Sequence, residues 1–400
     1  MKRTVSLIWA GLALASFAGV QFEVKNVEAH QRYPWNGKVD IDFLIDCADS
    51  AAEFDVTVEC TDHIGGTNVM MKTIKKNDIG ETATKFTLQK GQHRLVWNAD
   101  VDCPNVKLAN ISFAVFAKLL GEEDAADYLI IDLSGGPEAP AYPVSYRVGI
   151  PADGWTDEYK TTKLVMRKCP AGKFINTEYD GGEVTLTKDF FAGVFEVTQK
   201  QWFLVMGSLP SSLQDSWNLY GVGDLHPVYY VSYNDVRGKS NGSRWPASSA
   251  VDALSFVGKL RAKTGLNELD LPTEAQWECA CRAGTTTEYN IGDSEGSLAT
   301  AGWYSGNEGN KSHPVGQKIE NSWGLYDMHG NVSEWCLDWN GENLLGTDPK
   351  GAASGSYRRD RGGHWSVRAG YCRSSSRDTS YTGPSGANMH IGFRLFRTCP

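Results

Sequence analysis

The stretch Gly324-Leu-Tyr-Asp-Met-His-Gly-Asn-Val-Ser-Glu-Trp335 decides the fold of the C-terminal part of this chain. Gly330 marks a backbone position that a side chain would block, because glycine has no Cβ atom. Trp335 offers a large apolar surface to a core. Taken alone, the two acids Asp327 and Glu334 indicate a turn with solvated or capped carboxylates. The segment therefore predicts a glycine-punctuated loop joined to short strands.

Three short helices are predicted around this segment. Thr198-Gln-Lys-Gln201 and Thr273-Glu-Ala-Gln276 are capping boxes, in which the threonine hydroxyl and the glutamine side chain each satisfy an amide at the start of a helix. Gly284 can end the second helix in the left-handed region. A third helix is predicted over residues 249–264, with Gly265 at its end. The many glycines and tryptophans between the helices indicate loops held by a core.

The N-terminal part has a different pattern. Phe54-Asp-Val-Thr-Val-Glu-Cys60 alternates apolar and polar residues, which places one face of a strand in a core and the other in water. Further strands are predicted over residues 39–46, 85–88, 93–97, 111–117, 128–133 and 144–148. Seven short strands without a convincing helix predict an all-β immunoglobulin-like sandwich over residues 21–150. A polar linker is predicted at 151–165, and an α+β domain over 166–400.

The N-terminus has the features of a signal peptide over residues 1–20. Lys2 and Arg3 precede an uncharged apolar run, and the small residues Ser16 and Ala18 flank a predicted cleavage point. An uncleaved membrane anchor is the alternative, but the run is short for a span of ~20 residues. We expect a secreted, periplasmic or cell-surface protein without a membrane span after cleavage. Disulfides are then allowed, and the odd number of nine cysteines leaves at least one outside intrachain pairs.

Six segments of the C-terminal part together resemble the formylglycine-generating enzyme, or sulfatase-modifying factor, family. They are Gly193-Val-Phe-Glu-Val-Thr-Gln199, His226-Pro-Val-Tyr-Tyr-Val-Ser232, Leu271-Pro-Thr-Glu-Ala-Gln-Trp-Glu278, the stretch 324–335, Arg361-Gly-Gly-His-Trp365 and Ile391-Gly-Phe-Arg394. Each segment is weak alone, but all six follow the order of the family. The resemblance leaves out the N-terminal strands. It implies an α+β, C-type-lectin-like fold with little regular structure.

The resemblance implies a calcium site in the loop 327–334. Carried over residue by residue, the ligands are the side chains of Asp327 and Glu334 and the main-chain carbonyls of Gly330 and Val332. Carboxylate and carbonyl oxygens suit this hard cation. The loop departs from the family pattern at Ser333, where the family has a tryptophan.

The resemblance also implies a copper site, which this sequence does not complete. Family enzymes hold copper(I) between two cysteines and activate O₂, oxidising a cysteine of an unfolded sulfatase to formylglycine. Counted from the paired glycines, Cys372 matches the second of these cysteines and Tyr371 the tyrosine before it. Val367 stands where the first cysteine is expected, and His364 replaces a serine. The candidate catalytic residues Cys372, Tyr371 and His364 therefore lack one of the two sulfur ligands.

Counting backwards from the Gly-Phe-Arg segment gives Cys372 another role. It then matches a half-cystine whose partner in the family lies on the helix of Cys281, which implies a Cys281–Cys372 disulfide. The two assignments stay open, and they exclude each other because a disulfide sulfur is neither a nucleophile nor a copper ligand. In a C-type-lectin-like fold the terminal strands run side by side. The resemblance therefore predicts that Cys169 and Cys399 are close enough to bond.

Three functions fit these observations. An oxidase of the family type, or a related O₂-using enzyme, acts on an unfolded sulfatase or another exported protein. A non-catalytic binding module instead presents the loops 208–225 and 378–388 to a protein or a glycan, and a structural cell-surface role is the third. The formal net charge of −9 disfavours nucleic acid, because an acidic surface repels phosphates. The spacings of five histidines match no metal motif: His226, His313, His329, His364 and His390.

Overall fold

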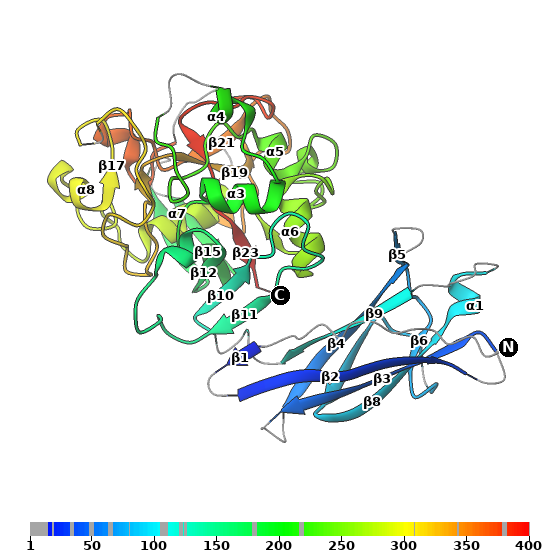
Figure 1. The fold of residues 1–400 in the computed structure, drawn as a ribbon. Helices are drawn as coiled ribbons and strands as arrows, with labels where there is room; N and C mark the ends of the chain where they lie inside the picture. The colour runs from blue at the N-terminus through cyan, green and yellow to red at the C-terminus, as the bar shows by residue number, and fades with distance from the viewer. Residues whose placement is uncertain are drawn as a thin grey trace. The chain divides into compact units, whose positions relative to one another are not determined.

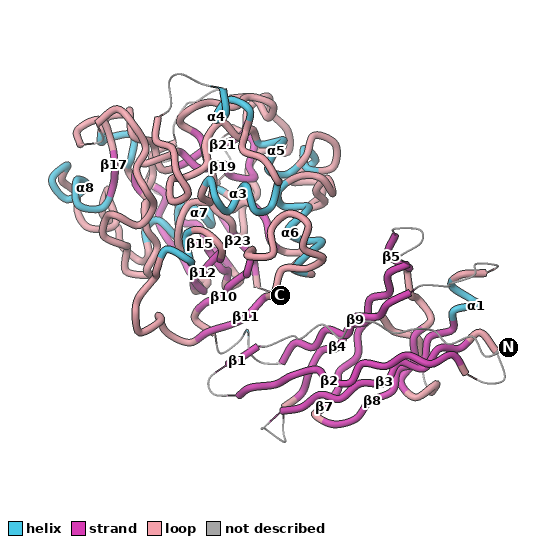
Figure 2. The backbone as a smooth tube through the Cα atoms, in the orientation of Figure 1, coloured by secondary structure: helices cyan, strands magenta, loops and turns pink. Residues whose placement is uncertain are grey.

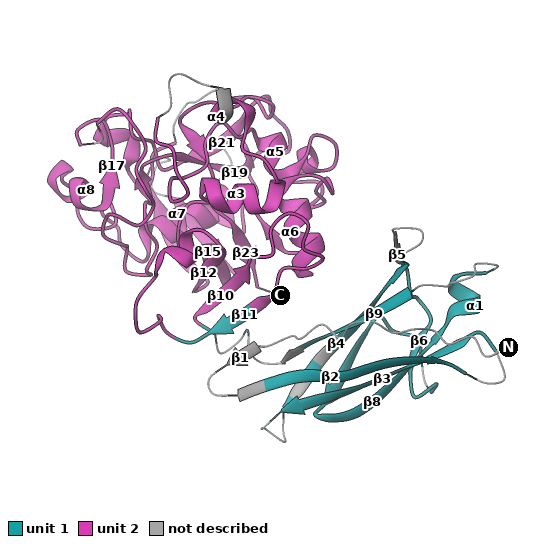
Figure 3. Cartoon of the chain, viewed as in Figure 1, with its two compact units in different colours: residues 1–126, 145–148 teal, residues 127–144, 149–400 magenta. Residues whose placement is uncertain are grey.

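Figure 1 shows the computed structural model of the chain. It describes residues 15–17, 20–32, 36–47, 52–62, 67–79, 81–104, 111–119, 123, 126–177, 182–215, 220–307, 309–341, 344–377 and 382–399. The chain divides into two compact units, residues 1–126 with 145–148 and residues 127–144 with 149–400 (Figure 3). Strands dominate unit 1, whereas loops and short helices make up much of unit 2 (Figure 2).

Unit 1 contains two sheets that share one apolar core. The first sheet has the order β1-β2-β3-β8-β6, and the second has the order β5-β4-β7 with β9 also paired to β4. The elements are β1 Ala15–Phe17, β2 Val20–Gln31, β3 Lys38–Cys47, β4 Glu53–Asp62, β5 Thr67–Val69, β6 Ile74–Lys76, β7 Lys85–Gln89, β8 Gly91–Asn98, α1 Ala99–Asp102 and β9 Ile111–Leu119.

The alternation in β4 produces this core. Phe54, Val56 and Cys60 are buried in one cluster with Ile41 of the opposite sheet, so the two sheets pack face to face. All seven predicted runs occur as strands, although the run at 128–133 forms β10 of unit 2. The long strand β2 was not predicted.

The predicted signal peptide is only partly described. β1 lies within residues 1–20, and residues 1–14 and 18–19 lie outside the described part of the chain. Among the helices that the structure describes, none combines the length and the apolar character needed to cross a bilayer.

A twisted antiparallel sheet with the order β10-β12-β15-β23-β16 forms the base of unit 2. Three smaller sheets, β13-β14-β20, β17-β18 and β21-β19-β22, support the loops above it. The strands are β10 Tyr128–Asp132, β12 Lys163–Cys169, β13 Gly172–Asn176, β14 Gly182–Leu186, β15 Phe190–Gly193, β16 Leu269–Asp270, β17 Gly302–Trp303, β18 His329–Gly330, β19 Ser333–Trp339, β20 Gly346–Thr347, β21 Arg358–Arg361, β22 Ile391–Gly392 and β23 Phe396–Thr398. The remaining strand, β11 Val144–Arg147, belongs to unit 1 from residue 145 on.

The helices of unit 2 are short, and their starts follow the predicted caps. Both capping boxes are present, at Thr198 with Gln201 and at Thr273 with Gln276. The helices are α3 Gln199–Met206, α4 Ser211–Asp215, α5 Tyr233–Arg237, α6 Phe256–Thr264, α7 Glu274–Arg282 and α8 Glu295–Ala301, with 3-10 turns η1 Asp157–Lys160, η2 Gly242–Arg244 and η3 Ala369–Cys372.

Two helix boundaries and the linker differ from the prediction. α7 is closed by Ala283, which has φ of +45°, one residue before the predicted Gly284. α6 ends at Gly265 as predicted but begins only at Phe256, because the Ser255 hydroxyl accepts a bond from the Gly258 amide and caps the helix there. Residues 151–165 form η1 and the start of β12, so they lie within unit 2.

Candidate functional site

The loop 327–334 turns through three residues with left-handed backbone. φ is +56° at Asp327, +84° at Gly330 and +59° at Asn331. A Cβ atom at Gly330 would lie 2.0 Å from the carbonyl oxygen of Trp303 on the paired strand β17. Gly330 therefore occupies a position that a side chain would block, as the sequence predicted.

Three carboxylates and one guanidinium lie buried against this loop: Glu196, Asp327, Glu334 and Arg394, which we call the acid cluster. Arg394 Nε lies 2.8 Å from Glu334 Oε1 and 2.7 Å from Oε2. The indole Nε1 of Trp277 donates to the same Oε2 at 2.7 Å. Both oxygens of Glu334 therefore already accept charge-assisted or indole hydrogen bonds.

The other two carboxylates have shifted pKa values. Burial raises the pKa of Asp327 to about 6 and outweighs the bond from the Gly316 amide. Burial, followed by the nearby charges of Asp327 and Glu334, raises the pKa of Glu196 well above its ordinary value. One guanidinium does not neutralise three buried carboxylates, so the acid cluster must hold a proton or a cation at neutral pH.

Of the two side chains predicted to bind calcium, only Asp327 fits this arrangement. Its Oδ2 accepts the Gly316 amide at 2.7 Å, whereas the buried Oδ1 has no hydrogen-bond partner. An orphaned carboxylate oxygen suits a hard cation. Glu334 does not fit, because Arg394 and Trp277 occupy its oxygens. Within the described part of the chain, no three His, Cys, Asp or Glu side chains are grouped as metal ligands.

Asn331 joins the acid cluster to the surface. Its Nδ2 donates to Glu196 Oε2 at 2.6 Å, and Glu196 Oε1 accepts the Val332 amide at 3.1 Å. Asn331 Oδ1 accepts the main-chain amide of His313 at 2.9 Å, and its carbonyl accepts that of Trp365 at 2.9 Å. The buried carboxylate of Glu196 thus fixes two segments that are far apart in the sequence.

Trp365 also belongs to a group of stacked rings: Tyr220, His364, Trp365 and His390, which we call the ring cluster. The rings of His364 and His390 stack with centroids 4.0 Å apart and planes 15° apart. Trp365 stacks on Tyr220 at 5.1 Å and contacts His390 at 5.0 Å. Trp365 is buried, and the other three rings are partly exposed. The cluster brings together Tyr220 of the loop 208–225, the segment after the paired glycines, and His390, which follows the loop 378–388 by two residues.

His364 and His226 are neutral at pH 7. Burial, and then His390, lower the pKa of His364 to about 3. Burial, and then His313, lower the pKa of His226 to about 4. His313 stacks on Trp303 with centroids 3.7 Å apart. A neutral ring stacks without the cost of burying a charge.

The three candidate catalytic residues have different surroundings. Cys372 is fully buried in an apolar cluster with Tyr289, Leu298 and Tyr304, and Val367 packs against the same cluster. His364 belongs to the ring cluster, and the side chain of Tyr371 is half exposed. The structure therefore brings Val367 and Cys372 together, but it does not bring the three candidate side chains into one catalytic group.

Comparison with known proteins identifies the domain. Residues 156–399 match the family model described as "Sulfatase-modifying factor enzyme 1-like domain". The chain belongs to this family. It is 28% identical over 262 residues to the "Chaperone protein LppX" of Paenibacillus barcinonensis, an alignment that covers 56% of this chain and 84% of LppX. It is 30% identical over 191 residues to the formylglycine-generating enzyme of Thermomonospora curvata, covering 42% of this chain and 54% of that enzyme.

Among solved structures, Treponema denticola variable protein 1 is 28% identical and aligns with a TM-score of 0.49. The alignment covers 60% of this chain and 96% of that protein. The chain thus spans only about half of the Thermomonospora curvata enzyme, although it spans most of LppX and of the Treponema protein.

The two disulfides that the resemblance implied are not formed in this structure. The structure contains all nine cysteines as thiols, so the pairs Cys281–Cys372 and Cys169–Cys399 are not formed in it and stay predictions. Cys281 Sγ lies 3.6 Å from the hydroxyl of Ser374. The premise for Cys169–Cys399 is wrong, because β15 lies between the terminal strands β12 and β23.

Sequence reasoning missed four residues of this site: Glu196, Asn331, Arg394 and Tyr220. A signal existed for Glu196, which is a single acid between the apolar residues Phe195 and Val197. A carboxylate in such a run is either on a wet face or buried with partners. Tyr220 carried no comparable signal, since its role depends on stacking against Trp365.

Proposed function

We propose that the family domain of this chain is a non-catalytic module that binds an exported protein through the ring cluster. The observation that carries the proposal is the contact of Val367 with the apolar cluster around Cys372. A family-type oxidation needs two thiolates for copper(I), and position 367 supplies a hydrocarbon instead. Val367 packs against the cluster that contains Cys372 and offers no sulfur there.

The composition of the ring cluster supports protein binding. Tyrosine and tryptophan are enriched at protein interfaces because they bury large areas with few rotatable bonds. The rings of Tyr220, His364 and His390 are partly exposed. Trp365, which contacts Tyr220 and His390, is held through its main-chain amide by the Asn331 carbonyl. The relative covered over most of its length bears the name of a chaperone, which is consistent with a protein ligand. The enzymes of the family oxidise an unfolded sulfatase. In this proposal, the chain binds such a protein without oxidising it.

A copper(I) titration separates this proposal from the oxidase. We expect the reduced full chain to compete poorly for copper(I) against a chelator and to consume no O₂ with a cysteine-containing peptide. Val367→Cys is the matched variant, because it restores a second sulfur beside Cys372 and should bind one copper(I). Stoichiometric copper binding and peptide oxidation by the unaltered chain would overturn the proposal.

A binding assay tests the ligand class. The probe is reduced, carboxymethylated α-lactalbumin as an unfolded protein, with a glycan array in parallel. Tyr220→Ala should weaken binding to the protein at least tenfold, whereas Tyr357→Ala, on another exposed tyrosine, should change it less than twofold. If the chain binds glycans but not the unfolded protein, the proposed protein ligand is wrong and the ligand is a glycan.

The proposal has four further parts. The family domain has a C-type-lectin-like frame and binds a calcium ion at Asp327. Unit 1 is an immunoglobulin-like sandwich, and the chain is exported.

The calcium part is tested by melting the full chain with EDTA and with added calcium. A cation that binds only the folded state raises stability by about 2.7 kcal/mol at a hundred times its dissociation constant. An unchanged melting temperature would remove calcium from the proposal.

A further inference from the structure

Two buried cysteines from different elements of unit 2 share one apolar cluster. Cys169 is the last residue of β12 and is fully buried. Cys279 lies in α7, which packs over the same core. Both side chains belong to one apolar cluster that also contains Phe190 and Ala192 of β15. The cluster therefore places a strand thiol and a helix thiol in one environment.

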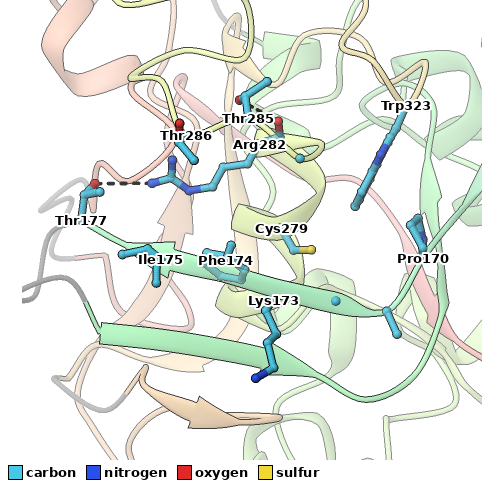
Figure 4. A pocket seen from close by; sticks show the side chains of 13 residues that line it. Pro170, Lys173, Phe174, Ile175, Thr177, Cys279, Arg282, Thr285, Thr286 and Trp323 are labelled. Carbon is cyan, nitrogen blue, oxygen red and sulfur yellow. Dashed lines mark hydrogen bonds between the residues drawn. The ribbon is translucent and has the colours of Figure 1, made fainter.

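Cys279 also lies at a pocket of unit 2. It lines a pocket of about 140 Å³ together with Pro170 and Ala171, the two residues that follow Cys169. Figure 4 shows the Cys279 sulfur directed toward the side of the pocket where Pro170 lies. Cys279 and the two residues that follow Cys169 therefore line one pocket.

A third thiol, Cys399, competes for Cys169. Cys169 pairs with Phe190 across β12 and β15, whereas the Cys399 amide donates to the Asp189 carbonyl on the opposite edge of that segment, at 2.9 Å. The backbones of Cys169 and Cys399 are therefore two strand spacings apart, about 10 Å, beyond the ~7 Å between Cα atoms that a disulfide tolerates. Cys279, by contrast, lies in the same buried apolar cluster as Cys169.

We propose that Cys169 and Cys279 form a disulfide, which fastens α7 to β12, when the folded chain meets a low-molecular-weight disulfide. The Cys279 thiolate attacks one sulfur of the reagent RSSR, so that a mixed disulfide forms and one RS⁻ leaves. The Cys169 thiolate then attacks the Cys279 sulfur and expels the second RS⁻. Two protein thiols are oxidised, one RSSR is reduced to two RSH, and the two protons pass to the leaving thiolates.

The electrostatics set the pH at which the reaction is observed. Burial raises the pKa of Cys279 to about 12. Burial, and then the neighbouring thiol of Cys279, raise the pKa of Cys169 well above its ordinary value. Since only the thiolate attacks, the initial rate should rise about tenfold per pH unit between pH 7 and pH 9.

The experiment uses the full reduced chain with hydroxyethyl disulfide at pH 8.5. After an acid quench and alkylation, peptides are mapped without reduction. We expect a cross-linked peptide pair that contains Cys169 and Cys279. Cys399→Ser should give the same cross-linked peptide pair in an amount within twofold of that from the unaltered chain. This variant keeps the test valid if Cys169→Ser, which alters the core, folds poorly. Cys169→Ser should instead retain the hydroxyethyl group on Cys279.

Two outcomes would overturn the proposal. One is a Cys169–Cys399 cross-link that disappears in Cys399→Ser. The other is full alkylation of Cys169 in a chain whose circular dichroism shows it folded throughout the reaction. A melting temperature at least about 5 °C higher in the oxidised chain is the expected secondary readout, because a cross-link over so long a loop restricts the unfolded chain.

Discussion

The acid cluster and the apolar surroundings of Cys372 are both buried parts of the same family domain, but they are built in opposite ways. The first holds Glu196, Asp327 and Glu334 against the single cation Arg394. The second encloses a thiol with Tyr289, Leu298 and Val367. A buried charge fixes its neighbours, because each lost partner costs several kcal/mol. Among the described residues, the apolar surroundings of Cys372 contain no such charge pair. A valine at position 367 therefore leaves the fold of the domain intact.

The largest expected effect comes from breaking the acid cluster at Arg394. Arg394→Met leaves Glu334 buried without its counter-charge, and removal of one partner of a buried pair costs about 3–5 kcal/mol. Urea unfolding of the full chain measures this loss. Arg373→Met, at a side chain that is 38% exposed, should change stability by less than about 0.5 kcal/mol. A similar small loss in both variants would contradict the structural role of the ion pair.

Asp327→Asn tests the excess negative charge. The raised pKa of about 6 means that the folded chain holds a proton that the unfolded chain releases near pH 4. Stability should therefore fall as pH rises from about 4 to about 6. Without divalent cations, Asp327→Asn should remove this slope and stabilise the chain at pH 7 by about 2–3 kcal/mol. Unfolding in EDTA at several pH values measures it, with the exposed Asp157→Asn as control; identical slopes in all variants would exclude the shift.

The surroundings of Cys372 are tested by a pair of small substitutions. Serine adds a hydroxyl to an apolar cluster, whereas alanine adds no polar group. We expect Cys372→Ser to be less stable than Cys372→Ala by about 1 kcal/mol, the low end of the cost of an unmet hydroxyl. Chemical denaturation of both variants compares them directly. A serine variant as stable as the alanine variant would show that this environment is polar.

The ring cluster is tested through its dependence on pH. The depressed pKa of His364, about 3, keeps the ring neutral while the unfolded chain takes up a proton near pH 6.5. Stability from this ring is therefore complete above pH 6.5 and is lost as pH falls toward 3. His364→Phe keeps a ring for the stack, worth about 0.5–1.5 kcal/mol, and should melt with less loss between pH 7 and pH 5. His30→Phe, at an exposed histidine of unit 1, should keep the original pH dependence.

The sequence predicted the features that depend only on residues close together in the chain. The capping boxes at Thr198 and Thr273 involve side chains three residues apart, so local chemistry is sufficient to define them. The alternation of β4 identified its buried face for the same reason. Helix α6 was placed less well, because Ser255 competes as a cap inside the predicted range.

By itself, the sequence determined the family frame, the starts of two helices and the hydrocarbon at Val367. Only the tertiary structure decided that Glu196 holds Asn331, a contact between residues 135 positions apart, and that β15 separates Cys169 from Cys399. Strand order and buried charge pairing depend on which distant segments meet in the core. No local pattern of residues encodes that meeting, because it is fixed by the burial of the whole domain at once.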